Sequence, residues 1–464
     1  MKFFFFVFFF VLLFLQQWLH CLSAVNYVTH LPGFQGELPF HLETGYVSID
    51  DDSGAELFYY FVRSDSKPEE DPLILWLSGG PGCSGFVGLA LEMGPLHFKV
   101  DTFDGNIPTL VVNPYSWTKI ANMIFLDWPV GTGFSYSMTD KDYITEDIQA
   151  KENILKFLRK WFLRHPNFML NPFYMGGDSY GGKMATLVSH DIVEENEQGQ
   201  KPLINIKGYL IGNTITGEKI DINSQVPHAY GLGIISEELY ELIQKNCVGE
   251  DYDQPQGAVC KTHLQAFNAF LSKINVFGIL EPLCSNGFPG GMLRLHRSLE
   301  ENSPDFVSQS SPDNNCITSD LLANYWANNQ LVRNVLQIKE GTVGRWYGCN
   351  LNVSIYNYSR LSIPSSLPYH RSLTTRGYRA LVYSGDHDLQ VSFVGTLEWI
   401  KSLRYIVLDP WRSWHAVGQV AGYTILFGNN LTFATVKGGN HLAPANRPLQ
   451  SFVMFERWIS QQIL

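Results

Sequence analysis

Six short apolar segments, spread over most of the chain, constrain its fold more than any other feature of the sequence. They cover residues 73–77, 123–126, 173–175, 209–211, 380–383 and 431–436. Their hydrophobicity is continuous rather than alternating, which is typical of strands buried on both faces of a parallel sheet. Between the second and third segments, Ile148, Leu155 and Leu158 recur at helical spacing and predict a crossover helix. The alternation of strands and helices predicts an α/β fold with a mostly parallel central sheet.

Glycines and chemically reactive side chains follow several of these segments directly. The stretches concerned are Ser78-Gly79-Gly80, Gly176-Gly177-Asp178-Ser179, Asp386-His387-Asp388 and Gly439-Asn440-His441. Open α/β sheets bind their ligands at the carboxyl ends of the strands. We therefore expect these loops to meet at one site, although they lie far apart in the sequence.

The stretch Gly177-Asp178-Ser179-Tyr180-Gly181 matches the pattern G-x-S-x-G and lies between a predicted strand and a helix-compatible segment. In such a nucleophile elbow, the glycines allow a sharp turn that presents the serine hydroxyl to the cleft. The alternative interpretation is a structural turn, because a short glycine motif also arises by chance. The position after a strand favours Ser179 as a nucleophile.

A serine nucleophile needs a base, and the base needs an acid that orients it. In the chain order of α/β hydrolases both follow the serine, and the acid comes before the histidine. His441 lies in a glycine-rich loop after the last apolar segment and is the predicted base. Asp386 and Asp388 compete for the role of the acid. We predict Asp388, with Asp386 as a carboxylate that stabilises the turn.

The negative charge that develops on a substrate carbonyl needs two backbone N–H donors. We predict the N–H of Tyr180, directly after the serine, and that of Gly80, in the loop after the first strand. The same loop has a competing interpretation, because Gly80, Gly82 and Gly85 form the pattern G-x-G-x-x-G of dinucleotide-binding proteins. A proline inside this turn and the remaining catalytic candidates disfavour it, so no cofactor or metal is predicted.

The N-terminus indicates where the protein is directed, and the net charge indicates which partners are disfavoured. Lys2 precedes an apolar run over residues 3–15, and a small-residue stretch ends at Ala24. Thirteen helical residues span about 20 Å, less than a bilayer core. Residues 1–24 therefore predict a secretory signal peptide, with a buried helix or an uncleaved anchor as alternatives. The net charge of −11 without a basic run disfavours nucleic acid and anionic membranes as partners.

Cysteine usage and sequons agree with export through the secretory pathway. Without Cys21, which lies in the predicted signal, six cysteines remain, and an even number suggests three disulfides. They are Cys83, Cys247, Cys260, Cys284, Cys316 and Cys349. The residues alone leave fifteen pairings open. The sequons at Asn352, Asn357 and Asn430 are predicted glycosylation sites.

The middle of the chain differs from the two ends. Residues 216–370 lack comparable strand segments and hold most of the cysteines. Chain length alone suggests three domains, but we prefer one catalytic core, residues 25–215 and 371–464, with 216–370 as an inserted lid. The stretch 285–315 is rich in turn residues, and we hypothesise that proteolysis excises part of it.

Together these motifs resemble the serine carboxypeptidase family. The resemblance runs from about residue 30 to the C-terminus and rests on the first glycine loop, the elbow, the Asp388 loop and the His441 loop. It implies an α/β-hydrolase fold with a helical insertion, Ser179, Asp388 and His441 as a triad, and Gly80 and Tyr180 as oxyanion donors. It also implies three disulfides, namely Cys83–Cys349, Cys247–Cys260 and Cys284–Cys316.

Details near the elbow resemble the plant serine carboxypeptidase-like acyltransferases more than the peptidases. Peptidase members carry Glu before the serine and Asn before the first Gly-Gly, and these groups hold the terminal carboxylate of the peptide. Here the two positions are Asp178 and Ser78, while Glu92 is retained. The predicted substrate-binding residues are thus Ser78, Gly79, Glu92 and Asp178. The resemblance implies acyl transfer from 1-O-β-glucose esters to alcohols or amines, usually in the vacuole.

The chain also departs from the acyltransferase pattern. The elbow of that subgroup usually continues Ser-Gly-Met, whereas Gly181-Gly182-Lys183 stands here, and Asn440 replaces the glycine before the histidine. We expect Lys183 and Asn440 to affect substrate choice. Three hypotheses follow: an acyltransferase that uses a small-molecule donor and acceptor, an exocarboxypeptidase acting on peptide C-termini, and a non-catalytic secreted paralogue. The predicted final compartment is the vacuole or the extracellular space.

Overall fold

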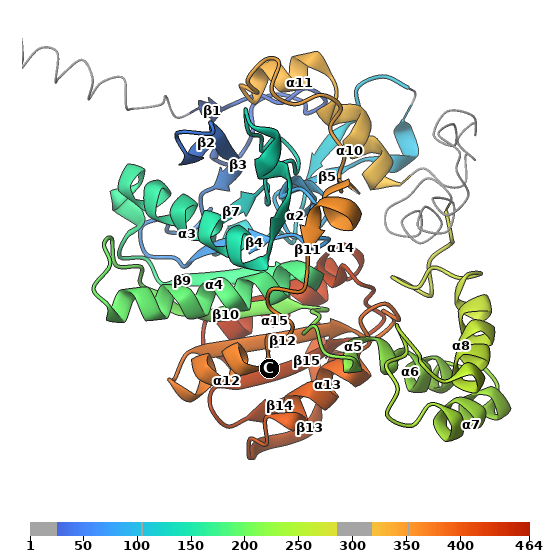
Figure 1. Ribbon diagram of the computed structural model, residues 1–464. Coiled ribbons are helices and arrows are strands. Elements are labelled where there is room, and N and C mark those ends of the chain that lie inside the picture. Colours follow the sequence, from blue (N-terminus) through green and yellow to red (C-terminus); the bar gives the residue numbers. More distant parts are fainter. Residues whose placement is uncertain (1–25, 104, 285–317, 351) are drawn as a thin grey trace, which may run out of the picture.

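An eleven-stranded sheet forms the centre of the protein in a computed structural model, which describes residues 26–103, 105–284, 318–350 and 352–464 (Figure 1). In spatial order its strands are β1 (Asn26–Val28), β2 (Leu42–Asp50), β3 (Ala55–Val62), β7 (Asn122–Leu126), β4 (Leu73–Leu77), β9 (Phe173–Asp178), β10 (Ile206–Gly212), β12 (Arg379–Gly385), β15 (Leu431–Val436), β14 (Gln419–Phe427) and β13 (Val407–Ala416). Two small pairs lie outside it: β5 (Leu96–Phe98) with β6 (Leu110–Val112), and β8 (Thr145–Glu146) with β11 (Tyr358–Ser359).

The six strands from β7 to β15 are parallel to one another, and each contains one of the six apolar segments. The predicted α/β class and parallel centre are therefore confirmed. The flanking strands β1 to β3 and β13 to β14 pair antiparallel, and the sequence interpretation missed them. The outermost pair β13–β14 exposes many of its side chains, so it lacks the continuous apolar signal.

Side chains of each central strand alternate between two hydrophobic clusters. In β4, Leu73, Leu75 and Leu77 belong to one cluster, while Ile74 and Trp76 belong to the other. All five side chains are buried. This alternation follows from the two-residue period of a strand, and burial on both faces explains why the segment is apolar throughout.

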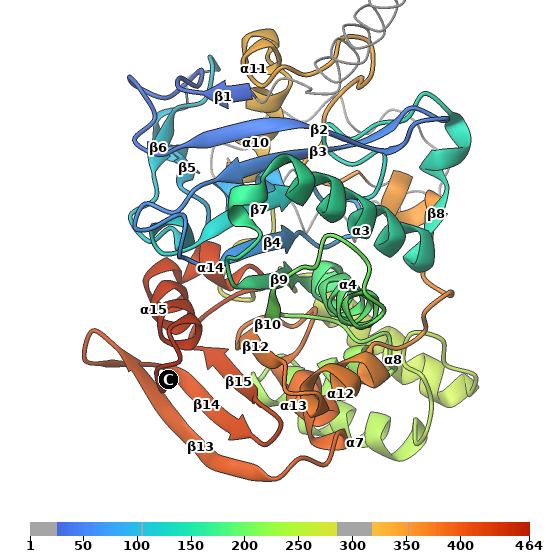
Figure 2. The ribbon, with the colours of Figure 1, turned by 90° about the vertical axis from the view of Figure 1, so that its left-hand side faces the viewer.

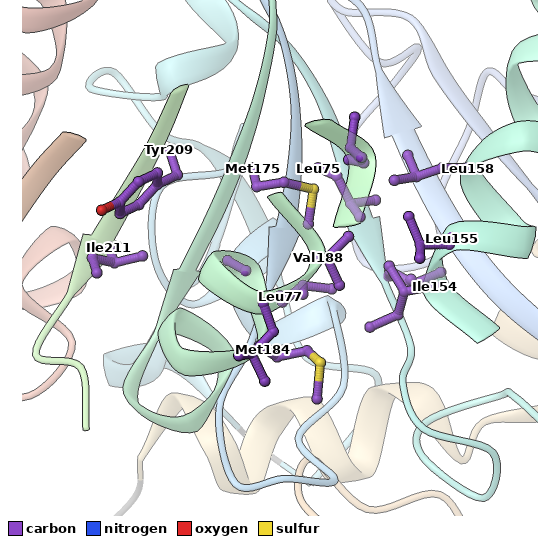
Figure 3. Packing of buried hydrophobic residues seen from close by; sticks show 14 of the residues in the cluster. Leu75, Leu77, Ile154, Leu155, Leu158, Met175, Met184, Val188, Tyr209 and Ile211 are labelled. Atoms are coloured by element: carbon purple, nitrogen blue, oxygen red, sulfur yellow. The ribbon is translucent and has the colours of Figure 1, made fainter. Parts of the chain in front are cut away.

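One face of the sheet is covered by α3 (Asp147–Arg164), α4 (Ser179–Glu197), α12 (Leu367–Thr375) and α13 (Phe393–Ser402) (Figure 2). Figure 3 shows Leu155 and Leu158 of α3 and Met184 and Val188 of α4 in the same cluster as Leu75 and Leu77 of β4, with Met184 next to Leu77. The predicted crossover helix is thus α3, between β7 and β9 in the chain.

The opposite face carries α2 (Phe86–Ala90), α10 (Ser319–Ala327), α14 (Ala443–Asn446) and α15 (Pro448–Ile459). Trp117 stacks on Phe455 of α15, with ring centroids 4.3 Å apart. The described structure also contains short helical turns: η1 (Val100–Thr102), η2 (Trp117–Lys119), η3 (Asp140–Tyr143), η4 (Pro166–Phe168) and η6 (Asn352–Asn357).

The segment 216–370, which we predict to be a lid, packs in two separate places. Its first helices are α5 (Ile220–Asn223), α6 (Gln225–Gly231), α7 (Glu237–Asn246) and α8 (Ala258–Leu271). Side chains of α6, α7 and α8 form a small hydrophobic cluster of their own with Leu389. By contrast, α10 and α11 (Gln330–Val335) pack into the cluster on the second face of the sheet. The division into core and lid stays a prediction. Because α10 and α11 pack against the sheet, we assign them to the core rather than to the lid.

Two of the implied disulfides, Cys83–Cys349 and Cys247–Cys260, are present. The predicted partner of Cys284, Cys316, lies outside the described residues, as do the predicted signal peptide and the stretch 285–315. Asn352 and Asn430 are exposed and Asn357 is half-buried. Within the described ranges, the helices are all too short or too polar to cross a bilayer.

We expect Leu75→Ala to lower the free energy of unfolding by about 2–5 kcal/mol, because Leu75 is 0% exposed in a strand covered on both faces. The matched control is Leu408→Ala in β13, where the side chain is 58% exposed and the expected change is within about 0.5 kcal/mol. Urea unfolding followed by tryptophan fluorescence measures both. Equal losses would contradict the layered core.

Candidate active site

The carboxyl ends of the parallel strands bring the predicted loops together. Ser179 follows β9, Asn213 follows β10, and the loop with Asp388 follows β12. These three strands are neighbours in the sheet, and β15, which precedes the loop with His441, lies next to β12. The loops converge because parallel strands end at the same edge.

Ser179 occupies a strained turn between β9 and α4. Its φ is 52°, in the left-handed region that non-glycine residues rarely adopt. The chain around it is tightly packed: a Cβ on Gly181 would lie 1.9 Å from the carbonyl oxygen of Leu77. A Cβ on Gly177 would lie 2.6 Å from the carbonyl carbon of Gly181. Both positions therefore require glycine, because the neighbouring backbone leaves no room for a side chain. Ser179 itself remains partly exposed.

Asp388 and His441 form a buried pair. Asp388 Oδ2 lies 2.7 Å from His441 Nδ1, and the two side chains are 0% and 5% exposed. The same Oδ2 accepts a hydrogen bond from Asn213 Nδ2 at 2.7 Å. Oδ1 accepts from the backbone N–H groups of Gln390 at 2.8 Å and Val391 at 3.2 Å. Four hydrogen bonds thus fix the orientation of the carboxylate.

Asp386, the competing acid, has other partners. Its Oδ1 accepts the backbone N–H of Gly438 at 2.6 Å and lies 2.7 Å from His387 Nδ1. These bonds tie the loop after β12 to the loop after β15. The structure therefore brings Asp388, and not Asp386, into contact with His441.

The electrostatics of His441 suit a base. Burial by itself would lower the pKa of the imidazole, but the Asp388 carboxylate, with a smaller contribution from Asp178, raises the pKa above its usual value. The backbone N–H of His441 donates to the carbonyl of Phe277 at 2.7 Å, and the two rings meet edge to face at 5.0 Å. The imidazole is thus held from the backbone as well as from Asp388.

The glycine loop after β4 lies against Ser179. A Cβ on Gly79 would lie 2.7 Å from Ser179 Cβ and 3.2 Å from Ser179 Oγ. Gly80 has a φ of 108°. The loop is anchored by the disulfide between Cys83 and Cys349 and by the hydrogen bond from the N–H of Ser84 to Gly348 at 2.8 Å. As the second residue of α4, Tyr180 has an N–H with no acceptor inside its helix.

Ser78, Glu92 and Asp178 form a group of buried polar side chains beside this site. They are 1%, 0% and 5% exposed. Within the described structure, Ser78 Oγ, both carboxyl oxygens of Glu92 and Asp178 Oδ1 have no hydrogen-bond partner. Burial raises the pKa of Asp178 to about 6, although His441 opposes this shift. Burial, with the charges of Asp178 and Asp320, raises the pKa of Glu92 well above its usual range.

A cavity of ≈ 520 Å³ adjoins His441. Its lining includes Glu281, Asp320, Asn440 and Asn446. Glu281 Oε1 accepts hydrogen bonds from Asn440 at 2.7 Å and Asn446 at 2.8 Å. Asn440, which stood out in the sequence, thus holds the cavity wall in place through Glu281.

The sequence interpretation missed Asn213, Phe277 and Glu281 as parts of the site. Asn213 carried a usable signal, because it comes two residues after the end of the fourth apolar segment, at the edge where the other loops meet. It also accepts the N–H of Gly385 at 3.0 Å, so it joins two strand ends. Phe277 and Glu281 carried no signal in the sequence, because they belong to the segment after α8 and reach the site only when the chain folds.

A strand-turn-helix serine, a buried acid–histidine pair and a parallel sheet covered on both faces define an α/β-hydrolase-type enzyme. A sequence model of the serine carboxypeptidase family matches residues 32–461, and the chain belongs to this family. Serine carboxypeptidase-like 16 from Arabidopsis thaliana is 43% identical over 443 residues, or 95% of each chain. Serine carboxypeptidase-like 19 from the same plant is 43% identical over 453 residues, or 96% of each chain.

Solved structures agree with the predicted fold. Kex1, a prohormone-processing carboxypeptidase from Saccharomyces cerevisiae, superimposes with a TM-score of 0.72 at 21% identity and covers 91% of both chains. The α/β-hydrolase fold and the serine carboxypeptidase-like enzyme class are thereby confirmed.

The rate at which a fluorophosphonate labels Ser179 should increase with pH, because His441 must be neutral to take a proton. Since the pKa of His441 is raised, the midpoint of this increase should lie above pH 6.5. We expect Asp388→Asn to move this midpoint downward, because burial is then opposed only by the weaker effect of Asp178, and to slow labelling about 10³- to 10⁴-fold. Mass spectrometry of the labelled peptide over a pH series measures both effects.

Asp386→Asn is the matched control for this experiment, because Asp386 contacts His387 and Gly438 rather than His441. Its midpoint should match that of the unaltered protein. A shift for Asp386→Asn with none for Asp388→Asn would reverse the assignment of the acid.

Proposed function

We propose that this protein is an acyltransferase that moves an acyl group from a 1-O-β-glucose ester to an alcohol or amine. The observation that carries the proposal is the 2.7 Å contact between Asp388 Oδ2 and His441 Nδ1, together with the left-handed φ of Ser179 at the end of β9. In the proposed roles, Ser179 is the nucleophile, His441 the base and Asp388 the group that orients it.

The reaction proceeds in two steps. His441 takes the proton of the Ser179 hydroxyl while its oxygen attacks the ester carbonyl, and the N–H groups of Gly80 and Tyr180 stabilise the oxyanion. The bond to glucose breaks, and glucose leaves with the proton from His441. An acceptor hydroxyl or amine then gives a proton to His441 and attacks the acyl-enzyme, and Ser179 recovers its proton from His441.

The buried group of Ser78, Glu92 and Asp178 supports a neutral donor rich in hydroxyl groups. A sugar hydroxyl both donates and accepts, so it can satisfy the unpartnered oxygens of these side chains in either protonation state. Gly79, whose Cα lies against Ser179, keeps this space open to the substrate. These four residues are the proposed donor-binding residues.

The raised pKa values of Asp178 and Glu92 favour one alternative, an exocarboxypeptidase. A peptide carboxylate only accepts hydrogen bonds, so carboxyl groups must be protonated to bind it. Because the pKa of Asp178 is raised to about 6, such binding would weaken as the pH rises through about 6. The short Asp178 and the lack of an amide at Ser78 disfavour this alternative.

The proposed location is the secretory pathway, ending in the vacuole or the extracellular space. The disulfides Cys83–Cys349 and Cys247–Cys260 support it, since such bonds persist in oxidising compartments. Glycosylation is proposed at the sequons of Asn352, Asn357 and Asn430.

We expect the purified protein to transfer an acyl group from a glucose ester to an alcohol acceptor, and Ser179→Ala to abolish the reaction. Chromatography of the products, run in parallel with a blocked dipeptide, measures transfer and peptide cleavage separately. Release of the C-terminal amino acid without acyl transfer would establish the carboxypeptidase. Inactivity in both assays, with no labelling of Ser179 by a fluorophosphonate, would indicate a non-catalytic paralogue.

The double variant Ser78→Asn, Asp178→Glu should raise the ratio of dipeptide cleavage to acyl transfer about tenfold or more. The amide supplies two donors, and the longer acid extends the reach toward a terminal carboxylate. The kcat/KM values for both substrates measure the ratio. Labelling of Ser179 is the control and should change by less than about threefold. An unchanged ratio would contradict the assignment of these residues to donor binding.

A further inference from the structure

Lys183 is a buried cation one helical turn beyond Ser179. Its side chain is 2% exposed, and its Nζ lies 3.0 Å from Oδ2 of Asp147, which is 0% exposed. Nζ also donates to the carbonyl oxygen of Ile363 at 2.7 Å. Lys183 is not among the residues that line the cavity beside His441, and its expected effect on substrate choice stays a prediction. Since burial of a charge pair is costly, the pair requires another role.

Asp147 links this ion pair to the residue after the serine. Its Oδ1 accepts hydrogen bonds from the hydroxyl of Tyr180 at 2.7 Å and from that of Tyr358 at 2.8 Å. Lys183 Nζ lies 5.1 Å from the centroid of the Tyr180 ring. Both members of the ion pair therefore contact the side chain of Tyr180, one at its hydroxyl and the other on its ring face.

A second cation connects Tyr180 to the glycine loop. The guanidinium of Arg360 lies 5.2 Å from the Tyr180 ring centroid, and its Nη2 donates to the carbonyl oxygen of Gly80 at 3.2 Å. The two residues proposed to supply the oxyanion donors are thus held by one set of contacts. Tyr180 itself is 2% exposed, so its ring is buried among these contacts.

We propose that the buried Lys183–Asp147 ion pair is a positioning device for the oxyanion site: it holds the Tyr180 side chain and thereby fixes the N–H of Tyr180 next to Ser179. This inference rests on the proposed function of Ser179. Lys183 is a positioning residue, because it acts through Asp147 and Tyr180 and touches no reacting atom.

The proposal has a kinetic signature. Oxyanion donors act in the transition state, so their displacement lowers kcat and leaves KM nearly unchanged. A displacement of about 1 Å in such a site costs on the order of 10²-fold in rate. Loss of one side-chain hydrogen bond displaces the N–H by less, so we expect a loss of about tenfold.

Hydrolysis of p-nitrophenyl acetate tests this, because it requires the serine, the base and the oxyanion donors but no natural substrate. We expect Tyr180→Phe, which removes the hydroxyl that Asp147 accepts, to lower kcat about tenfold with KM unchanged. Lys183→Met, which replaces the cation with an apolar chain of similar length, should lower kcat by a similar factor. Thermal unfolding of each variant shows whether it is folded at the assay temperature.

Tyr358→Phe is the matched control. It removes the other hydroxyl from the same oxygen of Asp147 but leaves the residue after Ser179 intact, so its kcat should stay within about twofold of the unaltered protein. Equal losses for both tyrosine variants, or no loss for Tyr180→Phe, would overturn the inference even where Lys183→Met fails to fold. A folded Lys183→Met with unchanged kcat would do the same. Absence of both ester hydrolysis and Ser179 labelling in the unaltered protein would instead overturn the proposed function, and this inference with it.

Discussion

The close approach of two backbones beneath Ser179 is the constraint on which the site depends. Where α4 starts, Gly181 lies so near the carbonyl of Leu77 at the end of β4 that no side chain fits between them. This contact sets the start of the helix against the sheet, and the serine at this point lies in the left-handed region. The strain is maintained because β4 and β9 are paired and buried on both faces, so the turn cannot relax without disrupting the core.

Around this fixed point, the other groups are positioned by hydrogen bonds that cross between strand ends. Asn213, after β10, binds both the Asp388 carboxylate and the N–H of Gly385 at the end of β12. Asp386 connects the loops after β12 and β15. The acid and the histidine are thus held by neighbours that take no part in the proposed chemistry, as preorganisation of a site requires.

The proposed difference between acyl transfer and peptide cleavage lies in a few buried side chains rather than in the catalytic groups. Ser78, Glu92 and Asp178 present unpartnered oxygens beside Ser179, and their protonation decides whether they donate or accept hydrogen bonds. The buried Lys183 adds a second kind of specialisation, because it acts on the geometry of the oxyanion site from outside the cavity.

The amino-acid sequence by itself determined the six parallel strands, because burial on both faces requires continuous apolar segments that can be read directly. It also determined the sharp turn at Ser179, since the close approach of the backbone requires glycine at 177 and 181. It did not reveal β13 and β14, which expose many of their side chains, or the separate packing of α10 and α11.

The sequence predicted Asp388 over Asp386, but only the tertiary structure shows that Asp388 contacts His441 while Asp386 contacts Gly438. It likewise brought Phe277 to His441 and Asp147 to Lys183, pairs separated by many residues and by no regular spacing. The local sequence pattern indicates which residues are buried and where the chain turns. Contacts between residues far apart in the sequence depend on how the helices and strands pack together.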